Sequence, residues 1–398
     1  MTLHYAKAQH PAASSSGSNT SESYNIFPND SNGNLSTVLL NQIVIPTVLE
    51  SEGNKSGGGV SIVVGVITPN GTSVSGYGNI SKADSTKVNG DAVFRIGSVT
   101  KLFTSTLLAD MVQRGIIKFD DPIEKYLPSN VTVPSYNGHE ITLEDLATQY
   151  SGLPEFPTGW IQNHSYTTQQ VYDFLSNSSL MSEPGTRFIY SNFGAGILGH
   201  ILSLKAGVSY EQLVRDRILN VLGMNSTGIA MNSTQITPLP DHLQSRLAKG
   251  HTAGKEVNQE FITETLQSAG AMYSTTNDLL KFLSANMGLI HTTINDALQD
   301  THLIRHHEFT KGNWSVTDGL GALYDGLTWQ ILTNLGGEDT IVAMGAATDG
   351  YTSFIAFNPT KQIGLVVLCS CDEADNNQLA LTQISLFPWL RGVPISDS

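Results

Sequence analysis

A buried helix entered through a tight turn is predicted near residue 100. The apolar positions at helical spacing are Leu102, Phe103, Leu107, Leu108 and Met111. We expect this helix to run from about Ser98 to about Gln113, because Gly97 permits a sharp turn into it and Gly115 ends it. Most of the helix should therefore be covered by the rest of the protein.

Runs of β-branched residues at both ends of the chain predict strands. Near the start, runs at 60–67 and 72–77 flank Asn70-Gly71, a strong hairpin signal. Near the end, strands are expected at 328–332, 340–344, 353–357 and 363–368, separated by turn residues. A helix over 35–49, which Pro46 should kink or end, precedes the first hairpin, and a helix over about 377–390 closes the chain.

The middle of the chain predicts helices joined by long loops. Capping residues place helix starts near Thr142, Thr167 and Thr275, and another helix is expected over 210–222. This order predicts an α+β fold, in which an antiparallel sheet flanked by helices forms an α/β lobe from 24–117 and 256–398. Residues 118–255 should form a mostly helical lobe of the same catalytic domain, with the site in the cleft between lobes. Residues 1–23 should be a disordered tail.

Charge and composition exclude several partners. The 21 basic and 35 acidic residues give a net charge of −14 without a basic cluster, which argues against nucleic acid and acidic membranes. No apolar run is long enough to span a membrane. Cys369 and Cys371 stand two apart on a predicted strand and are poorly placed to bridge each other, so we interpret them as packing residues. His306-His307 should lie on the surface, and no metal site or cofactor is expected.

N-glycosylation signals suggest export. Twelve N-x-S/T sequons occur, against roughly five expected by chance from the composition. They begin at Asn19, Asn29, Asn34, Asn54, Asn70, Asn79, Asn130, Asn163, Asn177, Asn225, Asn232 and Asn313. The alternative is simply an acidic surface rich in Asn, Ser and Thr. We expect a secreted or cell-surface protein whose signal segment lies outside this sequence.

The start of the buried helix carries a candidate nucleophile. Ser98 and Lys101 are three residues apart, so their side chains share one helix face. Burial makes a lysine easier to deprotonate, and a neutral amine can accept a proton from a serine hydroxyl. The alternative is a helix-capping serine beside a lysine that extends to solvent.

A second polar stretch, Tyr190-Ser191-Asn192, follows the turn Pro184-Gly185 and precedes an apolar helix. A tyrosine near an ammonium group can relay a proton to a leaving group. Asn192 offers amide donors and an acceptor for a substrate carbonyl and for the lysine. The alternative is a buried tyrosine with a capping asparagine. The same tripeptide pattern occurs at Tyr77-Gly78-Asn79, so it means little without its context.

Taken together, three motifs carry a family resemblance. They are Gly97-Ser98-Val99-Thr100-Lys101, Tyr150-Ser151-Gly152-Leu153-Pro154, and Pro184-Gly185 followed by Tyr190-Ser191-Asn192. In this order the sequence resembles the serine β-lactamase and penicillin-binding-protein superfamily over roughly 35–395. The closest branch contains class C β-lactamases, D,D-carboxypeptidases, D-aminopeptidases and related esterases. The resemblance implies a serine hydrolase that acts on a small molecule or peptide through an acyl-enzyme.

The resemblance also assigns roles to residues. Ser98 is the expected nucleophile, with Lys101 or Tyr190 as its base and Tyr190 as the proton donor to the leaving group. The substrate-binding residues that the resemblance implies are Asn192, Ala347, Tyr150, Met344 and Thr348. The amide groups of Ser98 and Ala347 are expected to form the oxyanion hole.

One position departs from the family pattern. Met344 stands where relatives carry the lysine or histidine that helps bind a substrate carboxylate. The substrate is therefore left open among a β-lactam, a D-amino-acid peptide and an ester or amide. The alternatives are a carboxylesterase-type hydrolase with little β-lactamase activity and a non-catalytic binding protein that keeps the fold. The sequence does not decide the oligomeric state.

Overall fold

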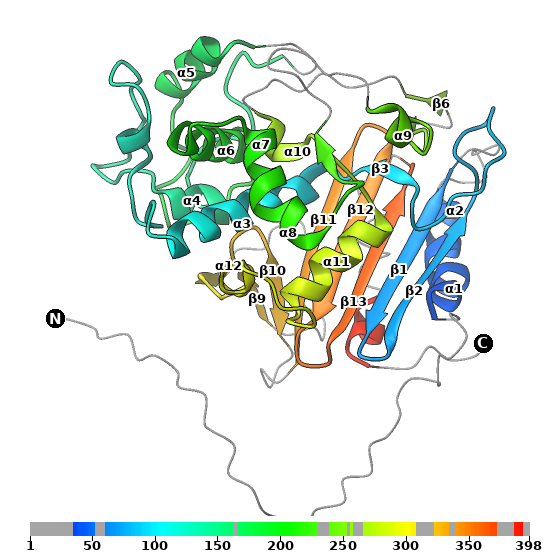
Figure 1. Ribbon diagram of the computed structural model, residues 1–398. Helices are drawn as coiled ribbons and strands as arrows, with labels where there is room; N and C mark the ends of the chain where they lie inside the picture. The colour runs from blue at the N-terminus through cyan, green and yellow to red at the C-terminus, as the bar shows by residue number, and fades with distance from the viewer. Residues whose placement is uncertain are drawn as a thin grey trace, which may run out of the picture.

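The computed structural model describes residues 35–51, 60–161, 166–229, 239–252, 255–257, 266–307, 322–333, 339–371 and 386–392. The predicted tail at 1–23 and residues 377–385 of the predicted closing helix lie outside these ranges. Within them, an antiparallel sheet has the strand order β2-β1-β13-β12-β11-β10-β9-β8 (Figure 1). Its strands are β1 (Ile62–Thr68), β2 (Gly71–Tyr77), β8 (His306–His307), β9 (Ala322–Asp325), β10 (Gln330–Thr333), β11 (Thr340–Thr348), β12 (Tyr351–Asn358) and β13 (Ile363–Cys369).

The two ends of the chain meet in this sheet, as the strand pattern predicts. β1 pairs with β13, with Ile62 opposite Cys369 and Val66 opposite Leu365. Alternate residues of β1 enter two different hydrophobic clusters, because successive side chains of a strand point to opposite faces. α11 (Thr276–Asn286) covers one face, whereas α1 (Leu35–Leu39), α2 (Ile45–Ser51) and the helical residues 386–390 cover the other (Figure 1).

Pro46 does not end the first helix, contrary to one form of the prediction. A π-helical turn, Leu40–Val44, joins α1 to α2 and the chain stays helical to Ser51. The amide of Ile45 donates to the carbonyl of Leu40 across this wider turn. Pro46 then stands at the second position of α2, directly after this wider turn, where the local change in backbone hydrogen bonding accommodates a residue without an N–H donor.

The remaining α-helices include several that pack against α3 (Thr100–Gln113), which is buried along most of its length. These remaining helices are α4 (Leu143–Thr148), α5 (Thr168–Ser176), α6 (Asn192–Ala206), α7 (Tyr210–Val214), α8 (Asn220–Leu222), α9 (Asp241–Gln244), α10 (Gln267–Gly270) and α12 (Asn295–Thr301). Short strands complete the fold: β3 (Val93–Arg95), β7 (Met272–Thr275) and β4 (Gly228–Ile229) form a small sheet, and β5 (His251–Thr252) pairs with β6 (Lys255–Glu256).

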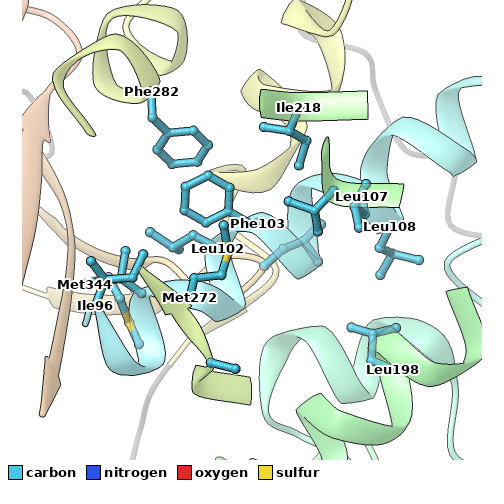
Figure 2. Close-up of a cluster of buried hydrophobic side chains, with 14 of the residues drawn as sticks. Ile96, Leu102, Phe103, Leu107, Leu108, Leu198, Ile218, Met272, Phe282 and Met344 are labelled. Atoms are coloured by element: carbon cyan, nitrogen blue, oxygen red, sulfur yellow. The ribbon is translucent and has the colours of Figure 1, made fainter. Parts of the chain in front are cut away.

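A single hydrophobic cluster extends from the sheet into the helices. It contains Val63 of β1 as well as Leu146 of α4. Figure 2 shows its centre, where the ring of Phe103 on α3 stacks on Phe282 of α11 with 4.6 Å between ring centroids. The two predicted lobes therefore share one core, and α3 lies inside it.

One expectation about individual side chains is wrong, and the surface placement expected for the two histidines holds for His307, which is exposed. Cys369 and Cys371 form a disulfide, with 5.2 Å between their Cα atoms. The strand ends at Cys369 and the chain bends at Ser370, which brings the two Cα atoms closer than in an extended strand. His306 is only partly exposed, because its ring stacks on Tyr150 with 3.8 Å between centroids.

Across the described ranges, no helix is both long enough and apolar enough to cross a membrane.

Candidate active site

The serine turn is held in place from two sides. Ser98 lies in a short 3₁₀ turn, Gly97–Val99, and Gly97 adopts a φ of +49°, which glycine reaches without strain. The amide of Ile96 donates to the carbonyl of Met272 at 3.0 Å, and the hydroxyl of Ser353 on β12 donates to the carbonyl of Ile96 at 2.9 Å. Ser98 is therefore fixed at the start of α3, between the small sheet and the large one.

The Tyr190-Ser191-Asn192 segment is held by the loop that follows α4. The Ser191 amide donates to the side-chain oxygen of Gln149 at 2.6 Å, and the Ser191 hydroxyl donates to the carbonyl of Pro154 at 2.7 Å. The Ser191 hydroxyl also caps α6 by accepting from the amide of Gly194. These bonds place the side chains of Tyr190 and Asn192 at the start of α6, beside the serine turn.

Lys101 joins the two segments. Its side chain is buried, with 1% exposed, and its Nζ lies 2.9 Å from Ser98 Oγ, 2.8 Å from Tyr190 Oη and 2.7 Å from Asn192 Oδ1. The carbonyl of Ala269 accepts a further bond from Nζ at 2.8 Å. The hydroxyl oxygens of Ser98 and Tyr190 are 2.5 Å apart. The four side chains singled out in the sequence therefore meet at one point.

The contacts of Lys101 define how protons can move. An ammonium group carries three N–H donors, and four oxygen atoms surround this one. The oxygens of Asn192 and Ala269 only accept, so they occupy two donors. The third is left for the hydroxyls of Ser98 and Tyr190, which are also hydrogen-bonded to each other. A proton can thus pass among serine, tyrosine and lysine over short hydrogen bonds.

Two residues that contact this group of side chains could not be identified from the sequence. Ala269 contributes only its backbone carbonyl, which any residue possesses. Glu155 accepts a hydrogen bond from Asn192 Nδ2 at 3.2 Å, while its own backbone carbonyl accepts from the amide of Phe193. Glu155 directly follows the Ser151–Pro154 motif, but nothing in that motif indicates that the next side chain reaches Asn192.

Tyr150 is buried and serves as packing in this arrangement. Its hydroxyl donates to Asp325 at 2.9 Å, its ring stacks on His306, and its backbone carbonyl accepts from the amide of Gly185. These contacts link the loop after α4 to strand β8 and to the turn that leads to Tyr190. The substrate-binding role expected for Tyr150 stays a prediction, and the contacts indicate that it positions the neighbouring loop.

The third motif lies along β11, next to the serine turn. β10 pairs with β11 only as far as Ala343, so the rest of that edge faces the turn at Gly97. A Cβ atom placed on Gly97 would lie 3.3 Å from the carbonyl oxygen of Ala347. Ala347 is exposed and Thr348 is partly exposed, so both lie at the surface end of the strand.

Met344 does not face open solvent. Only 8% of the residue is exposed, and it belongs to the main hydrophobic cluster. Figure 2 shows its side chain beside Ile96, immediately before the serine turn. The methionine therefore continues the apolar core beneath the turn, at the place where the family pattern has a cation.

The fold and the meeting of serine, lysine and tyrosine define a serine hydrolase. A family profile described as Beta-lactamase matches residues 48–386. The chain belongs to this family, and the resemblance and the α+β fold predicted from the sequence are confirmed.

Individual relatives agree with this assignment. The chain is 30% identical over 318 residues to the D-alanyl-D-alanine-carboxypeptidase/endopeptidase AmpH of Escherichia coli (strain K12), covering 78% of this chain and 79% of AmpH. It is 27% identical over 325 residues to a beta-lactamase of the same organism, covering 74% and 79%. The structure of a beta-lactamase/D-alanine carboxypeptidase from Yersinia pestis aligns with a TM-score of 0.72 at 24% identity, covering 90% and 99%, and shows the shared fold.

Proposed function

We propose that this serine hydrolase works through an acyl-enzyme on Ser98. The observation that carries the proposal is the buried Lys101 ammonium, which contacts both the Ser98 and the Tyr190 hydroxyls. A structural lysine needs only enough acceptors to offset the cost of burial. Here two of its partners are hydroxyls that exchange protons, and they lie within hydrogen-bonding distance of each other.

The reaction follows from these contacts. The Ser98 hydroxyl gives its proton either to Tyr190 in its phenolate form or to Lys101 in its neutral amine form, while its oxygen forms a bond to the substrate carbonyl carbon. The bond to the leaving group then breaks, and Tyr190 delivers a proton to that group. Water next attacks the acyl carbon and gives one proton to the same base; the bond to Ser98 Oγ then breaks, and that proton passes to the serine oxygen. Asn192 lies beside the same ammonium and orients the substrate carbonyl through its amide.

Ala347 is a suitable second donor to the oxyanion, together with the amide of Ser98. The Ala347 carbonyl faces Gly97, as the close approach to that residue indicates. Within a strand, the N–H and C=O groups of one residue point to the same side. The Ala347 amide is therefore directed toward the serine turn, where it needs no side chain to stabilise negative charge.

The substrate class follows from Met344 and from Glu155. No cation occupies the Met344 position, and the carboxylate of Glu155 lies beside Asn192. A substrate carboxylate would gain no ion pair at Met344 and would approach a negative charge on the Glu155 side. Within the family range of β-lactams, D-amino-acid peptides and simple esters or amides, we favour esters and amides that lack a carboxylate.

Export is proposed on two observations. Cys369 and Cys371 form a disulfide, and disulfides persist in oxidising compartments. The sequon asparagines Asn70, Asn130, Asn177 and Asn225 are exposed, so a glycan at these positions would point into solvent. Both observations fit a secreted or cell-surface enzyme.

A hydrolysis panel tests the proposed function. Nitrophenyl esters, a chromogenic cephalosporin and D-amino-acid peptides are compared with the purified protein and with Ser98→Ala. We expect ester hydrolysis that Ser98→Ala abolishes, with weaker turnover of the cephalosporin. If no substrate class is hydrolysed, the chain is a binding protein that keeps the fold. If the cephalosporin is turned over faster than the esters, the inference that Met344 disfavours substrates with a carboxylate is wrong.

A further inference from the structure

A cavity that is open to solvent lies beside the short α10 turn, whose Ala269 carbonyl contacts Lys101. It has a volume of about 350 Å³ and is lined by residues of α5, α6, α10 and the start of α7. This volume falls in the range of small-molecule sites in proteins. Its mouth is apolar, because Leu204 and Val208 stand there with 46% and 42% of their surfaces exposed.

Gln267 gives the cavity an unused polar group. The residue lines the cavity and is 8% exposed, yet its side-chain amide has no hydrogen-bond partner among the residues that the structure describes. Its amide atoms are not among the fully buried polar atoms without a partner, so they open into the cavity, where water or a ligand can bond to them. The amide presents one acceptor and two donors, and a ligand in the cavity would satisfy them.

The rest of the lining is uncharged. It offers the hydroxyls of Ser203 and Ser209 and the ring of His200, whose Nε2 lies 2.7 Å from Tyr172 Oη. Burial lowers the pKa of His200 to about 4, so the ring is neutral at physiological pH. Apart from this neutral histidine, no acidic or basic side chain lines the cavity to pair with a charged ligand.

We propose that this cavity is a binding site for a small uncharged amide with an apolar end. The ligand amide pairs with Gln267, because two amides can exchange an N–H···O bond in each direction. Its apolar end lies between Leu204 and Val208 at the mouth. Ions are excluded, since removing a charge from water without a partner is far more costly than removing an amide.

The cavity is also coupled to the catalytic site through the short α10 turn. Gln267 lines the cavity, and two residues later the carbonyl of Ala269 accepts from Lys101 Nζ. Between them, the carbonyl of Ser268 accepts from Thr104 on α3 at 2.8 Å. A ligand that holds Gln267 therefore also restrains the turn that contacts the lysine.

Fluorine NMR titration tests the site, with para-fluorobenzamide as the probe and para-fluorobenzoate and para-fluorobenzylammonium as charged analogues. We expect the benzamide to bind the full chain and the Ser98→Ala variant equally, and neither analogue to bind comparably. Gln267→Leu should weaken benzamide binding about tenfold, since it removes the paired hydrogen bonds. Val208→Trp, which fills the mouth of the cavity, should also weaken benzamide binding, although it leaves Gln267 unchanged.

Gln113→Leu is the matched control, because Gln113 is an exposed glutamine on α3 outside the cavity. It should leave benzamide binding unchanged. Thermal melts of all variants confirm that each one folds, and Val208→Trp provides the test if Gln267→Leu does not fold. The proposal is overturned if the benzamide fails to bind, if the mouth and amide variants bind it as tightly as Gln113→Leu does, or if the charged analogues bind as well.

Discussion

Gly199→Ala should damage the enzyme through packing alone. Gly199 lies on α6 against α10, and a Cβ atom added there would lie 2.2 Å from Ser268 Cβ and 2.3 Å from Ser268 Oγ. Ordinary contact distances require a separation larger by about 1 Å, so α10 must move away from α6. That movement carries the carbonyl of Ala269 away from Lys101 Nζ, which it contacts at 2.8 Å.

The expected magnitude combines two opposing terms. Alanine is favoured over glycine inside a helix by about 1 kcal/mol. Overpacking of a tight interface costs about 3 kcal/mol. The free energy of unfolding should therefore fall by about 2 kcal/mol. Because a displacement of about 1 Å near the reacting groups can cost about a hundredfold in rate, kcat/KM for a nitrophenyl ester should fall by up to that factor.

Urea unfolding and ester hydrolysis measure the two effects. Gly228→Ala is the matched control, since a Cβ atom there meets nothing within 4 Å, and it should leave both quantities near wild type. Removing the opposing side chain in Gly199→Ala/Ser268→Gly should restore much of the activity, giving a coupling free energy of about 2 kcal/mol. The reasoning is refuted if Gly199→Ala is more stable than wild type and fully active.

Three further outcomes are expected. Lys101→Met should reduce kcat/KM about a thousandfold, because it removes the amine that contacts both the Ser98 and the Tyr190 hydroxyls. Thermal melts should show that the variant still folds. Activity equal to that of wild type would exclude Lys101 from the chemistry. Met344→Lys should lower the free energy of unfolding by about 3 kcal/mol, because it places a cation among apolar side chains. The same variant should raise kcat/KM for the cephalosporin about tenfold. Unchanged turnover would show that other residues set the substrate specificity. Burial lowers the pKa of His302 to about 4 from 6.5, so the contribution of this histidine to stability is complete above pH 6.5 and is lost as the pH drops toward 4. Between pH 6.5 and 4, the free energy of unfolding of His302→Leu, measured with urea, should fall by about 3 kcal/mol less than that of wild type. His291 is exposed, so His291→Leu should show the same pH dependence as wild type.

The main elements of the fold are predictable because their signals are local. The glycine turn and the apolar spacing of α3 indicate the helix, and Asn70-Gly71 indicates the first hairpin. The disulfide is not predictable from an ideal strand, since it depends on the bend at Ser370. The stacking of His306 on Tyr150 is likewise not predictable, because the two residues are distant in sequence.

The site is only partly predictable from the sequence. Ser98, Lys101, Tyr190 and Asn192 carry their chemistry in their side chains, so motifs reveal them, and the structure brings them together. Ala269 acts through a backbone carbonyl, which leaves no signal in the sequence. The departure at Met344 is visible in the sequence, but only the structure shows that the side chain joins the core beneath the serine turn.

The measurement that tests the central claim most directly is the site of covalent labelling by a fluorophosphonate. Intact-mass and peptide-mapping mass spectrometry should find one adduct per chain, located on Ser98. Ser98→Ala should remain unlabelled, and Lys101→Met should be labelled far more slowly than wild type. Labelling at another residue, or equal labelling of wild type and Ser98→Ala, would contradict the assignment of Ser98 as the nucleophile.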